Sequence, residues 1–244
     1  MRATAGEGLD RASAVTITPV RGVELGVSGR DWRFADARRE AIERNFAALR
    51  SQKPALFNGP MYMLRQHAIE GGMFRGTVSR VDYASYLYWR ERRELDRSIR
   101  NVFGAAALHS ADGALLLGIM GPHTANAGLI YPPSGSPDDK DVKAGRLDLL
   151  GNIAREVAEE TGIALALPDR PSWLALEDGP RLALLLPVSL PCSADQLAGR
   201  VERHLAREPV PELSGIHVVR GRGDIVPERM QPYTLAYIHH VFAS

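Results

Sequence analysis

The segment from Asp148 to Gly162 constrains the fold more than any other part of the chain. Asp148 can accept a hydrogen bond from a free amide of a first helical turn, and Gly162 can adopt the left-handed conformation in which helices often end. Between them, Leu150, Ile153 and Val157 recur at the spacing of one helical face. The segment therefore predicts an amphipathic helix whose apolar stripe packs on a sheet.

Three glutamates occupy a neighbouring face of this helix. Glu156, Glu159 and Glu160 stand at positions i, i+3 and i+4, so their side chains lie close together. Like charges at these spacings repel each other, and the repulsion grows where water is partly excluded. A hard divalent cation such as Mg²⁺ or Mn²⁺ would offset it, because such ions bind carboxylate oxygens. The alternative is a solvated glutamate cluster on a surface helix.

The residues around the glutamates favour the metal site. The run from Arg155 to Ile163, REVAEETGI, resembles the second half of the Nudix box, G-x5-E-x7-R-E-U-x-E-E-x-G-U, in which U is a bulky aliphatic residue. Every specified position in that half matches. The resemblance implies a Nudix-type α/β/α sandwich with a mixed sheet. It also implies hydrolysis of a nucleoside diphosphate linked to another moiety.

The resemblance assigns a role to each matched position. It implies that Glu156, Glu159 and Glu160 bind Mg²⁺ or Mn²⁺ and act in catalysis, in which a metal-activated water attacks phosphorus. Arg155 would hold a glutamate through a charge-assisted hydrogen bond. Gly162 would let the chain turn after the helix.

The first half of the box does not match at its expected spacing. Counting back from Arg155, the glutamate position holds Leu147 and the glycine position holds Asp141. Either the loop carries an insertion, or the box is partly degenerate and activity is reduced. We favour the insertion, with Gly135 as the box glycine and an acid supplied by the loop. The candidate acids are Asp138, Asp139, Asp141 and Asp148.

A further acid, as general base or additional ligand, often comes from a loop after the box helix in this family. Glu212 is the first candidate, and Glu177 and Asp178 are the second. The candidate phosphate-binding residues are Arg181, Arg220 and Arg222.

Three short segments suggest a branch of the family. Leu56–Pro60, LFNGP, the helix start Asp148–Leu149 and Ser214–Ile216, SGI, resemble a Nudix branch that cleaves nucleotide sugars such as UDP-glucose and that carries an N-terminal extension. The alternative function is a non-catalytic Nudix-fold module that binds a nucleotide or regulates a partner, and the missing box glutamate motivates it.

Alternation and turn signals predict the remaining elements and the domain organisation. We expect strands within 15–27, 56–65, 73–78, 102–109, 114–120, 173–176, 182–190 and 216–219, helices at 31–49, 83–96, 193–206 and 233–242, and irregular structure over 121–146. We place a small α+β N-terminal extension at residues 1–98 and the Nudix hydrolase domain at residues 99–244.

Composition limits the class of protein. Hydrophobic residues form 45% of the 244 residues, which is enough for a full core, and a net charge of +1 argues against a bulk nucleic-acid binder. The single cysteine excludes an internal disulfide. No segment has the apolar run of a signal peptide or a membrane helix. We therefore expect a cytoplasmic protein that acts on a small-molecule nucleotide, and the N-terminal region could shape its pocket or build a homodimer.

Overall fold

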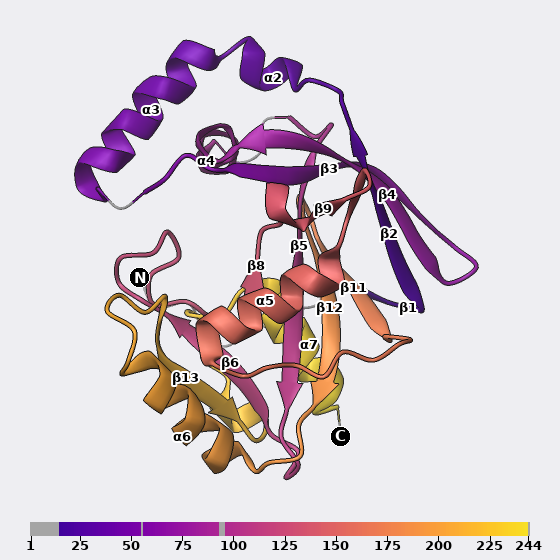
Figure 1. Cartoon of the computed structure of the whole chain (residues 1–244), viewed down its shortest axis with the longest axis vertical. Coiled ribbons are helices and arrows are strands. Elements are labelled where there is room, and N and C mark those ends of the chain that lie inside the picture. Colours follow the sequence, from indigo (N-terminus) through magenta and orange to yellow (C-terminus); the bar gives the residue numbers. More distant parts are fainter. Residues whose placement is uncertain (1–14, 55, 93–95, 244) are drawn as a thin grey trace.

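The computed structural model of the chain describes residues 15–54, 56–92 and 96–243 (Figure 1). Its strands are β1 (Thr16–Val20), β2 (Gly22–Ser28), β3 (Pro60–Glu70), β4 (Met73–Asp82), β5 (Arg100–His109), β6 (Leu115–Met120), β7 (Ile130–Tyr131), β8 (Ser134–Gly135), β9 (Val142–Lys143), β10 (Arg146–Leu147), β11 (Trp173–Asp178), β12 (Arg181–Ser189) and β13 (Leu213–Val219). Its helices are α2 (Arg33–Asp36), α3 (Arg39–Gln52), α4 (Tyr83–Glu91), α5 (Leu149–Thr161), α6 (Ala194–Leu205) and α7 (Pro232–Val241), with short 3₁₀ turns η1 (Asp139–Asp141) and η2 (Arg222–Asp224).

The strands form one mixed sheet with β5 near its centre. The main order is β1-β11-β12-β5-β3-β4-β2-β10-β9, and β13, β6 and β7 branch from β5 through β6. One edge of β5 pairs along its length with the parallel strand β12. The other edge pairs with β3 at its start, β8 in its middle and β6 at its end. The loop that precedes α5 therefore reaches the middle of the sheet.

Helices cover both faces of this sheet, and the side chains of β5 point alternately into the two cores that lie between the sheet and these helices. Val102 and Ala106 belong to the core that contains residues of α5 and α6. Phe103 and Ala105 belong to the core that contains residues of α7. The predicted fold class, a mixed sheet between helices, is confirmed.

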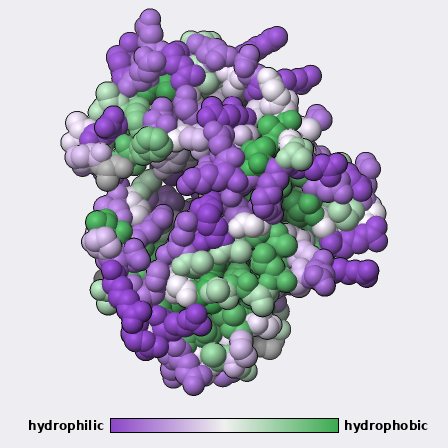
Figure 2. All heavy atoms as spheres, in the orientation of Figure 1, coloured by the Kyte–Doolittle hydropathy of each residue, from purple (hydrophilic) through white to green (hydrophobic). Residues whose placement is uncertain are grey.

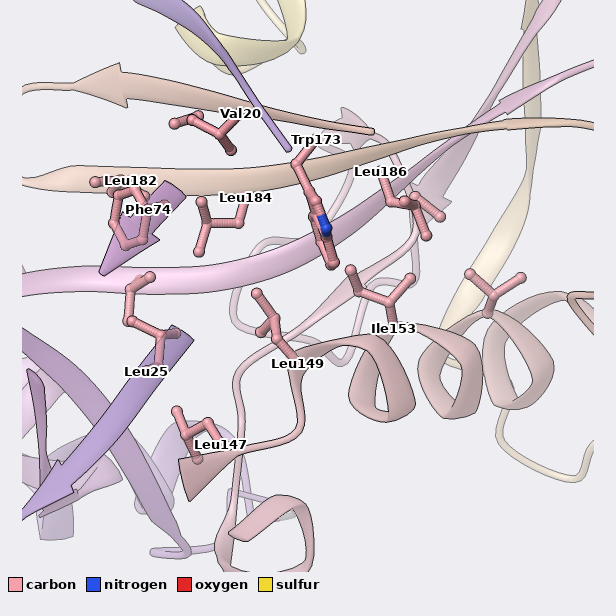
Figure 3. Packing of buried hydrophobic residues seen from close by; sticks show 14 of the residues in the cluster. Val20, Leu25, Phe74, Leu147, Leu149, Ile153, Trp173, Leu182, Leu184 and Leu186 are labelled. Carbon is pink, nitrogen blue, oxygen red and sulfur yellow. The ribbon is translucent and has the colours of Figure 1, made fainter. Parts of the chain in front are cut away.

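Close packing of α5 on the sheet depends on a glycine of β5. A Cβ atom at Gly104 would lie 2.6 Å from Cγ1 of Ile153 and 3.1 Å from Cδ1 of Leu149. Figure 3 shows both of these side chains directed toward the sheet near Leu184 and Trp173. Burying each aliphatic side chain contributes about 1.5–3 kcal/mol relative to exposure. This packing fixes the rotation of α5 and with it the direction of its acidic face.

The N-terminal region shares the sheet with the rest of the chain. β1 pairs with β11, β3 with β5, and β2 with β10. A third core of buried side chains, which includes Ile42, Phe46 and Trp89, joins α3 and α4 to β3 and β4. These pairings cross the proposed boundary at residue 98, and the division into two domains stays a prediction.

Most elements agree with the sequence expectations, and three differ. The helix expected over 31–49 is divided into α2 and α3, because Arg38 leaves the helical region with φ −126° and ψ 15°. The break allows Trp32 and Ile42 to enter the same core. The helix expected over 83–96 ends at Glu91, and residues 93–95 of that prediction lie outside the described residues. The segment 121–146 contains β7, β8, η1 and β9 and enters β10.

None of the helices that the structure describes has the length and apolar character needed to cross a bilayer.

Candidate active site

Helix α5 forms as its caps predict. Oδ1 of Asp148 accepts a hydrogen bond from the backbone N–H of Gly151 at 2.9 Å. At the other end, Gly162 has a φ of +67°, and its N–H donates to the carbonyl of Ala158 at 2.9 Å. A Cβ atom at Gly162 would also lie 2.7 Å from Cγ of His204. Asp148 and Gly162 therefore fix the length of the helix that carries the glutamates.

The three glutamates of α5 range from the interior to the solvent. Glu160 is 4% exposed, the side chain of Glu156 is 14% exposed, and that of Glu159 is 60% exposed. Oε2 of Glu160 is buried and has no hydrogen-bond partner among the residues that the structure describes. Buried polar atoms are nearly always paired, so this oxygen marks a position where a ligand is expected.

Burial and repulsion from neighbouring carboxylates disfavour the ionised forms of Glu156, Glu160 and Glu212. Burial raises the pKa of Glu156 to about 7, with contributions from Glu159 and Glu212, although Arg155 opposes the shift. The pKa of Glu160 is raised well above its ordinary value by burial, then by Glu212 and Glu156. Burial also raises the pKa of Glu212. The structure thus brings the three predicted ligands and Glu212 within electrostatic reach of one another.

Glu212 reaches the site from the segment before β13. Its carbonyl accepts a hydrogen bond from the N–H of Gly121 at 2.8 Å, which ties the segment to the end of β6. The other two candidate acids are engaged elsewhere. Glu177 accepts from Arg100 at 2.7 Å, and Asp178 pairs with Arg181 at 2.9 Å.

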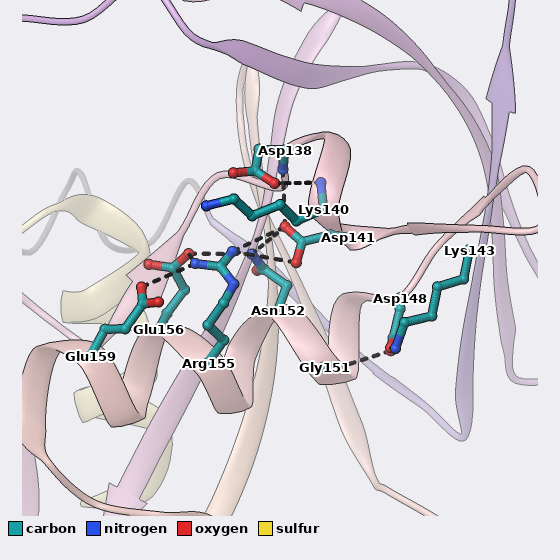
Figure 4. Close-up of polar contacts among 10 residues, drawn as sticks. All are labelled: Asp138, Lys140, Asp141, Lys143, Asp148, Gly151, Asn152, Arg155, Glu156 and Glu159. Atoms are coloured by element: carbon teal, nitrogen blue, oxygen red, sulfur yellow. Dashed lines mark hydrogen bonds and ion pairs between the residues drawn. The ribbon is translucent and has the colours of Figure 1, made fainter.

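Arg155 links the glutamates to the preceding loop (Figure 4). Its guanidinium lies 2.8 Å from Glu156 and 3.1 Å from Glu159. It also lies 3.1 Å from Asp141, which is 5% exposed and accepts a second bond from Nδ2 of Asn152 at 2.9 Å. Arg155 therefore contacts a loop acid as well as two glutamates of α5.

The structure singles out Asp141 among the four candidate loop acids. Asp138 caps η1, Asp139 pairs with Arg80 at 2.8 Å, and Asp148 caps α5. Five residues separate Gly135 from Asp141, which is the spacing of the glycine and the glutamate in the box. This spacing was the sequence signal that could have identified Asp141.

The insertion is the six-residue segment Val142–Leu147, which forms the β9–β10 hairpin. Without these residues, Asp141 and Arg155 would be separated by the seven positions of the box. The hairpin turns through Ala144 and Gly145, whose φ values are +48° and +75°, as a two-residue turn requires. The hairpin therefore supports the insertion that we favour from the sequence, while the roles of Gly135 and Asp141 in the box stay predictions.

Gly135 provides space for a glutamate. It pairs with Gly104 of β5, which brings its backbone to the centre of the sheet. A Cβ atom at Gly135 would overlap Cγ and Cδ of Glu156. Any larger residue at this position would displace the carboxylate, which supports Gly135 as the box glycine.

A cavity of about 510 Å³ adjoins the acidic cluster, and both Glu156 and Glu212 line it. Figure 2 shows a hollow in a mostly hydrophilic surface below the part formed by α3 and α4. Arg90 and Arg181 line the cavity and could contact a phosphate. The other two candidate arginines do not contribute to its wall, and one of them, Arg220, pairs with Asp195 at 2.6 Å.

The chemistry of these donors suits a hard divalent cation, although their side chains are not gathered around one position. The buried, unpartnered oxygen of Glu160 and the mutually repelling carboxylates around it offer the oxygen ligands that Mg²⁺ and Mn²⁺ prefer. As their side chains are oriented, the residues that the structure describes contain no group of three or more His, Cys, Asp or Glu close enough to hold a metal ion.

Comparisons with known proteins gave partial likenesses. No protein-family model and no curated protein matches the chain. A MutT protein from Methanosarcina mazei Go1 is similar at 22% identity over 38% of this chain and 67% of its own, with a TM-score of 0.31. A Nudix hydrolase from Nitrosomonas europaea is similar at 19% identity over 49% of this chain and 72% of its own, with a TM-score of 0.32.

The Nudix domain of Shewanella oneidensis NrtR, solved with ADP-ribose, is similar at 14% identity over 57% of this chain and 83% of its own, with a TM-score of 0.35. Because the likenesses are partial, we base the family assignment on the residues of the chain.

Proposed function

We propose that the protein is a Nudix-type pyrophosphohydrolase that cleaves a nucleoside diphosphate derivative with the help of Mg²⁺ or Mn²⁺. One observation carries the proposal. A capped helix with the residue pattern of the box presents glutamates that repel one another, and the buried oxygen of Glu160 has no partner within residues 15–54, 56–92 and 96–243. A divalent cation beside a substrate phosphate would satisfy this oxygen and neutralise the cluster.

The residues of the site would have different roles in this reaction. Glu156, Glu159 and Glu160 would hold the cation, which, when bound, would neutralise the diphosphate and lower the pKa of a water molecule. Arg155 and Asp141 orient Glu156. The water oxygen forms a bond to phosphorus as the phosphoanhydride bond breaks. Glu212 accepts the proton on a carboxylate oxygen, a role that its raised pKa suits.

A UDP-sugar, cleaved to UMP and a sugar 1-phosphate, is the substrate that we propose. The LFNGP segment motivates this choice, and its position supports it. Oδ1 of Asn58 accepts from the N–H of Ala84 at 2.7 Å, and the carbonyl of Gly59 accepts from the N–H of Tyr83 at 3.0 Å. The segment thereby positions the start of α4, which lines the cavity. The cytoplasmic setting and the homodimer stay predictions.

A substrate panel tests the proposal. Phosphate release, coupled to a phosphatase, is measured for nucleotide sugars and other nucleoside diphosphate derivatives with and without Mg²⁺ or Mn²⁺. We expect metal-dependent turnover of at least one substrate and a large loss in Glu156→Gln and Glu159→Gln. Glu202→Gln is the matched control, since Glu202 is an exposed glutamate on α6. Turnover that is independent of metal, or equal in all three variants, would contradict the proposal.

A non-catalytic nucleotide-binding module is the second candidate. Arg155 favours it, because its guanidinium already contacts both Glu156 and Glu159 and partly neutralises them without a metal. Calorimetry distinguishes the two candidates. Tight nucleotide binding together with no metal-stimulated cleavage across the panel would favour the binding module.

A further inference from the structure

The cavity beside the glutamates has an aromatic wall. Aromatic residues are 7% of the chain, yet six of them line this one cavity. They come from α4, β5, β7 and α7 and are Tyr83, Tyr86, Trp89, Phe103, Tyr131 and Tyr233. Aromatic side chains bind flat ring faces by stacking, so the wall suits a ligand with a planar ring.

A buried amide in the same wall has one end without a hydrogen-bond partner among the described residues. Asn101 of β5 is 6% exposed and lines the cavity. Its Nδ2 donates to the hydroxyl of Tyr86 at 3.4 Å, and its Oδ1 has no partner in the described part of the chain. If the amide were turned over, the nitrogen would be the free end instead. Because buried polar atoms are rarely left unpaired, one end of this amide is available to a ligand.

Cationic groups line the cavity together with this amide. Arg90 of α4 lies over the ring of Tyr86 at 5.5 Å and donates to Asn126 at 3.3 Å. Arg181 of β12 donates to Gln231 at 2.8 Å. The cavity thus combines arginine donors for an anion, a flat aromatic surface and a free amide, which are the features that a nucleotide requires.

We propose that Asn101 and the aromatic wall form a nucleobase subsite. Oδ1 of Asn101 accepts a hydrogen bond from an N–H on the edge of the base, and the ring of Tyr86 packs against the face of the base. Helix α4 of the N-terminal region therefore helps to select the substrate. This inference rests on the proposed function for its nucleotide ligand, and it names the part of the substrate that the N-terminal region binds.

Calorimetry with products and fragments tests the subsite without turnover. UMP and the other nucleoside monophosphates are compared with ribose 5-phosphate, which has a sugar and a phosphate but no base. We expect at least one nucleotide to bind about tenfold or more tightly than ribose 5-phosphate, as stacking and one hydrogen bond provide. Asn101→Leu should remove about tenfold of that preference and leave the affinity for ribose 5-phosphate unchanged.

Two further variants make this test specific. Asn45→Leu is the matched control, because Asn45 is an amide of α3 that pairs with Glu91 and does not line the cavity. If Asn101→Leu fails to fold, Tyr86→Leu replaces it, and loss of the ring should weaken nucleotide binding by about 5- to 150-fold.

Three results would overturn the subsite. In the first, the wild type binds nucleotides and ribose 5-phosphate with equal affinity. In the second, the variants lose affinity for both ligands by the same factor. In the third, a folded Asn101 or Tyr86 variant binds nucleotides as tightly as the wild type does. The second result would indicate a sugar site. Metal-dependent cleavage without base preference would refute the subsite and leave the hydrolase. Nucleotide binding that depends on Asn101, without cleavage of any substrate, would refute the hydrolase and leave the subsite.

Discussion

Two acidic regions meet at Arg155, and they differ in how their charges are satisfied. In the loop before α5, Asp139 pairs with Arg80 and accepts from the hydroxyl of Tyr62 at 2.9 Å. Asp141 pairs with Arg155, and Asp148 accepts from the Gly151 amide and pairs with Lys143. Each of these loop acids has a partner within the chain.

The second region, the glutamates of α5 together with Glu212, has few partners. Hydrogen bonding to Arg80 lowers the pKa of Asp139, and hydrogen bonding to Lys143 lowers that of Asp148. Burial, by contrast, raises the pKa values of Glu160 and Glu212. This difference in pKa direction separates acids that stabilise the fold from acids that are available to a ligand. Four changes test this separation, from the largest expected effect to the smallest.

Replacing the most buried glutamate should abolish activity and preserve the fold. Glu160→Gln is expected to lower kcat/KM by at least about a hundredfold, because even residues that only support metal ligands are worth 10- to 100-fold. Its free energy of unfolding without metal should not fall, since Gln keeps the shape and removes a repelled carboxyl. Steady-state kinetics and urea denaturation measure the two effects. A destabilised variant with normal turnover would reverse the assignment.

Metal should stabilise the wild-type protein through the same glutamate. After treatment with EDTA, Mn²⁺ at about 100 times its Kd should raise the free energy of unfolding by about 2.7 kcal/mol. At the same concentration the Glu160→Gln variant should gain much less. Urea denaturation with and without Mn²⁺ measures the difference, and an equal gain in both proteins would place the cation elsewhere.

Removing a paired acid should affect both stability and activity. Asp141→Asn leaves Arg155 without its loop partner, and we expect a loss of about 1.5–3 kcal/mol in unfolding free energy. Because Arg155 also contacts Glu156, kcat/KM should fall by about 10- to 100-fold. Asp141→Glu, which restores the glutamate of the box, is the control that keeps the charge. Unchanged stability and kinetics in Asp141→Asn would remove Asp141 from the box.

The smallest effect on stability is expected for the exposed ion pair between Arg80 and Asp139. Arg80→Ala should lose about 0.2–1 kcal/mol of stability, because the Arg80 and Asp139 side chains are 58% and 47% exposed and solvent screens the pair. Arg75→Ala is the matched control, since Arg75 pairs with Glu24 at similar exposures of 53% and 42%. Urea midpoints of the variants and the wild type give the comparison.

The effect of Arg80→Ala should also depend on pH in a defined direction. Since the pKa of Asp139 is lowered in the folded protein, its contribution is present above the ordinary value of 3.8 and is lost as pH falls below it. The difference between the wild type and Arg80→Ala should therefore shrink in acid. A difference that persists there would show that Arg80 stabilises the protein through another contact.

Local signals in the sequence predicted α5. Most of the residues that surround it could not be predicted, because they come from segments that are distant in the sequence. The capping residues Asp148 and Gly162 act within one helical turn, so the sequence alone defines the helix and the relative positions of its glutamates. Glu212 could be proposed from its place before a strand. The roles of Asn101 and of α4 in the cavity could not be predicted, because β5 and α4 come together only when the sheet and the third core form.

The β9–β10 hairpin changes how the motif should be searched for. The N–H of Asp148 donates to the carbonyl of Asp141 at 2.8 Å, so the residues that flank the six extra positions are hydrogen-bonded neighbours. With Asp141 as the proposed acid of the box, the motif is continuous in three dimensions, although a pattern of fixed length finds only its second half. Relatives with the same interruption would escape such a pattern, whereas a search that allows a gap of variable length after the loop acid would recover them.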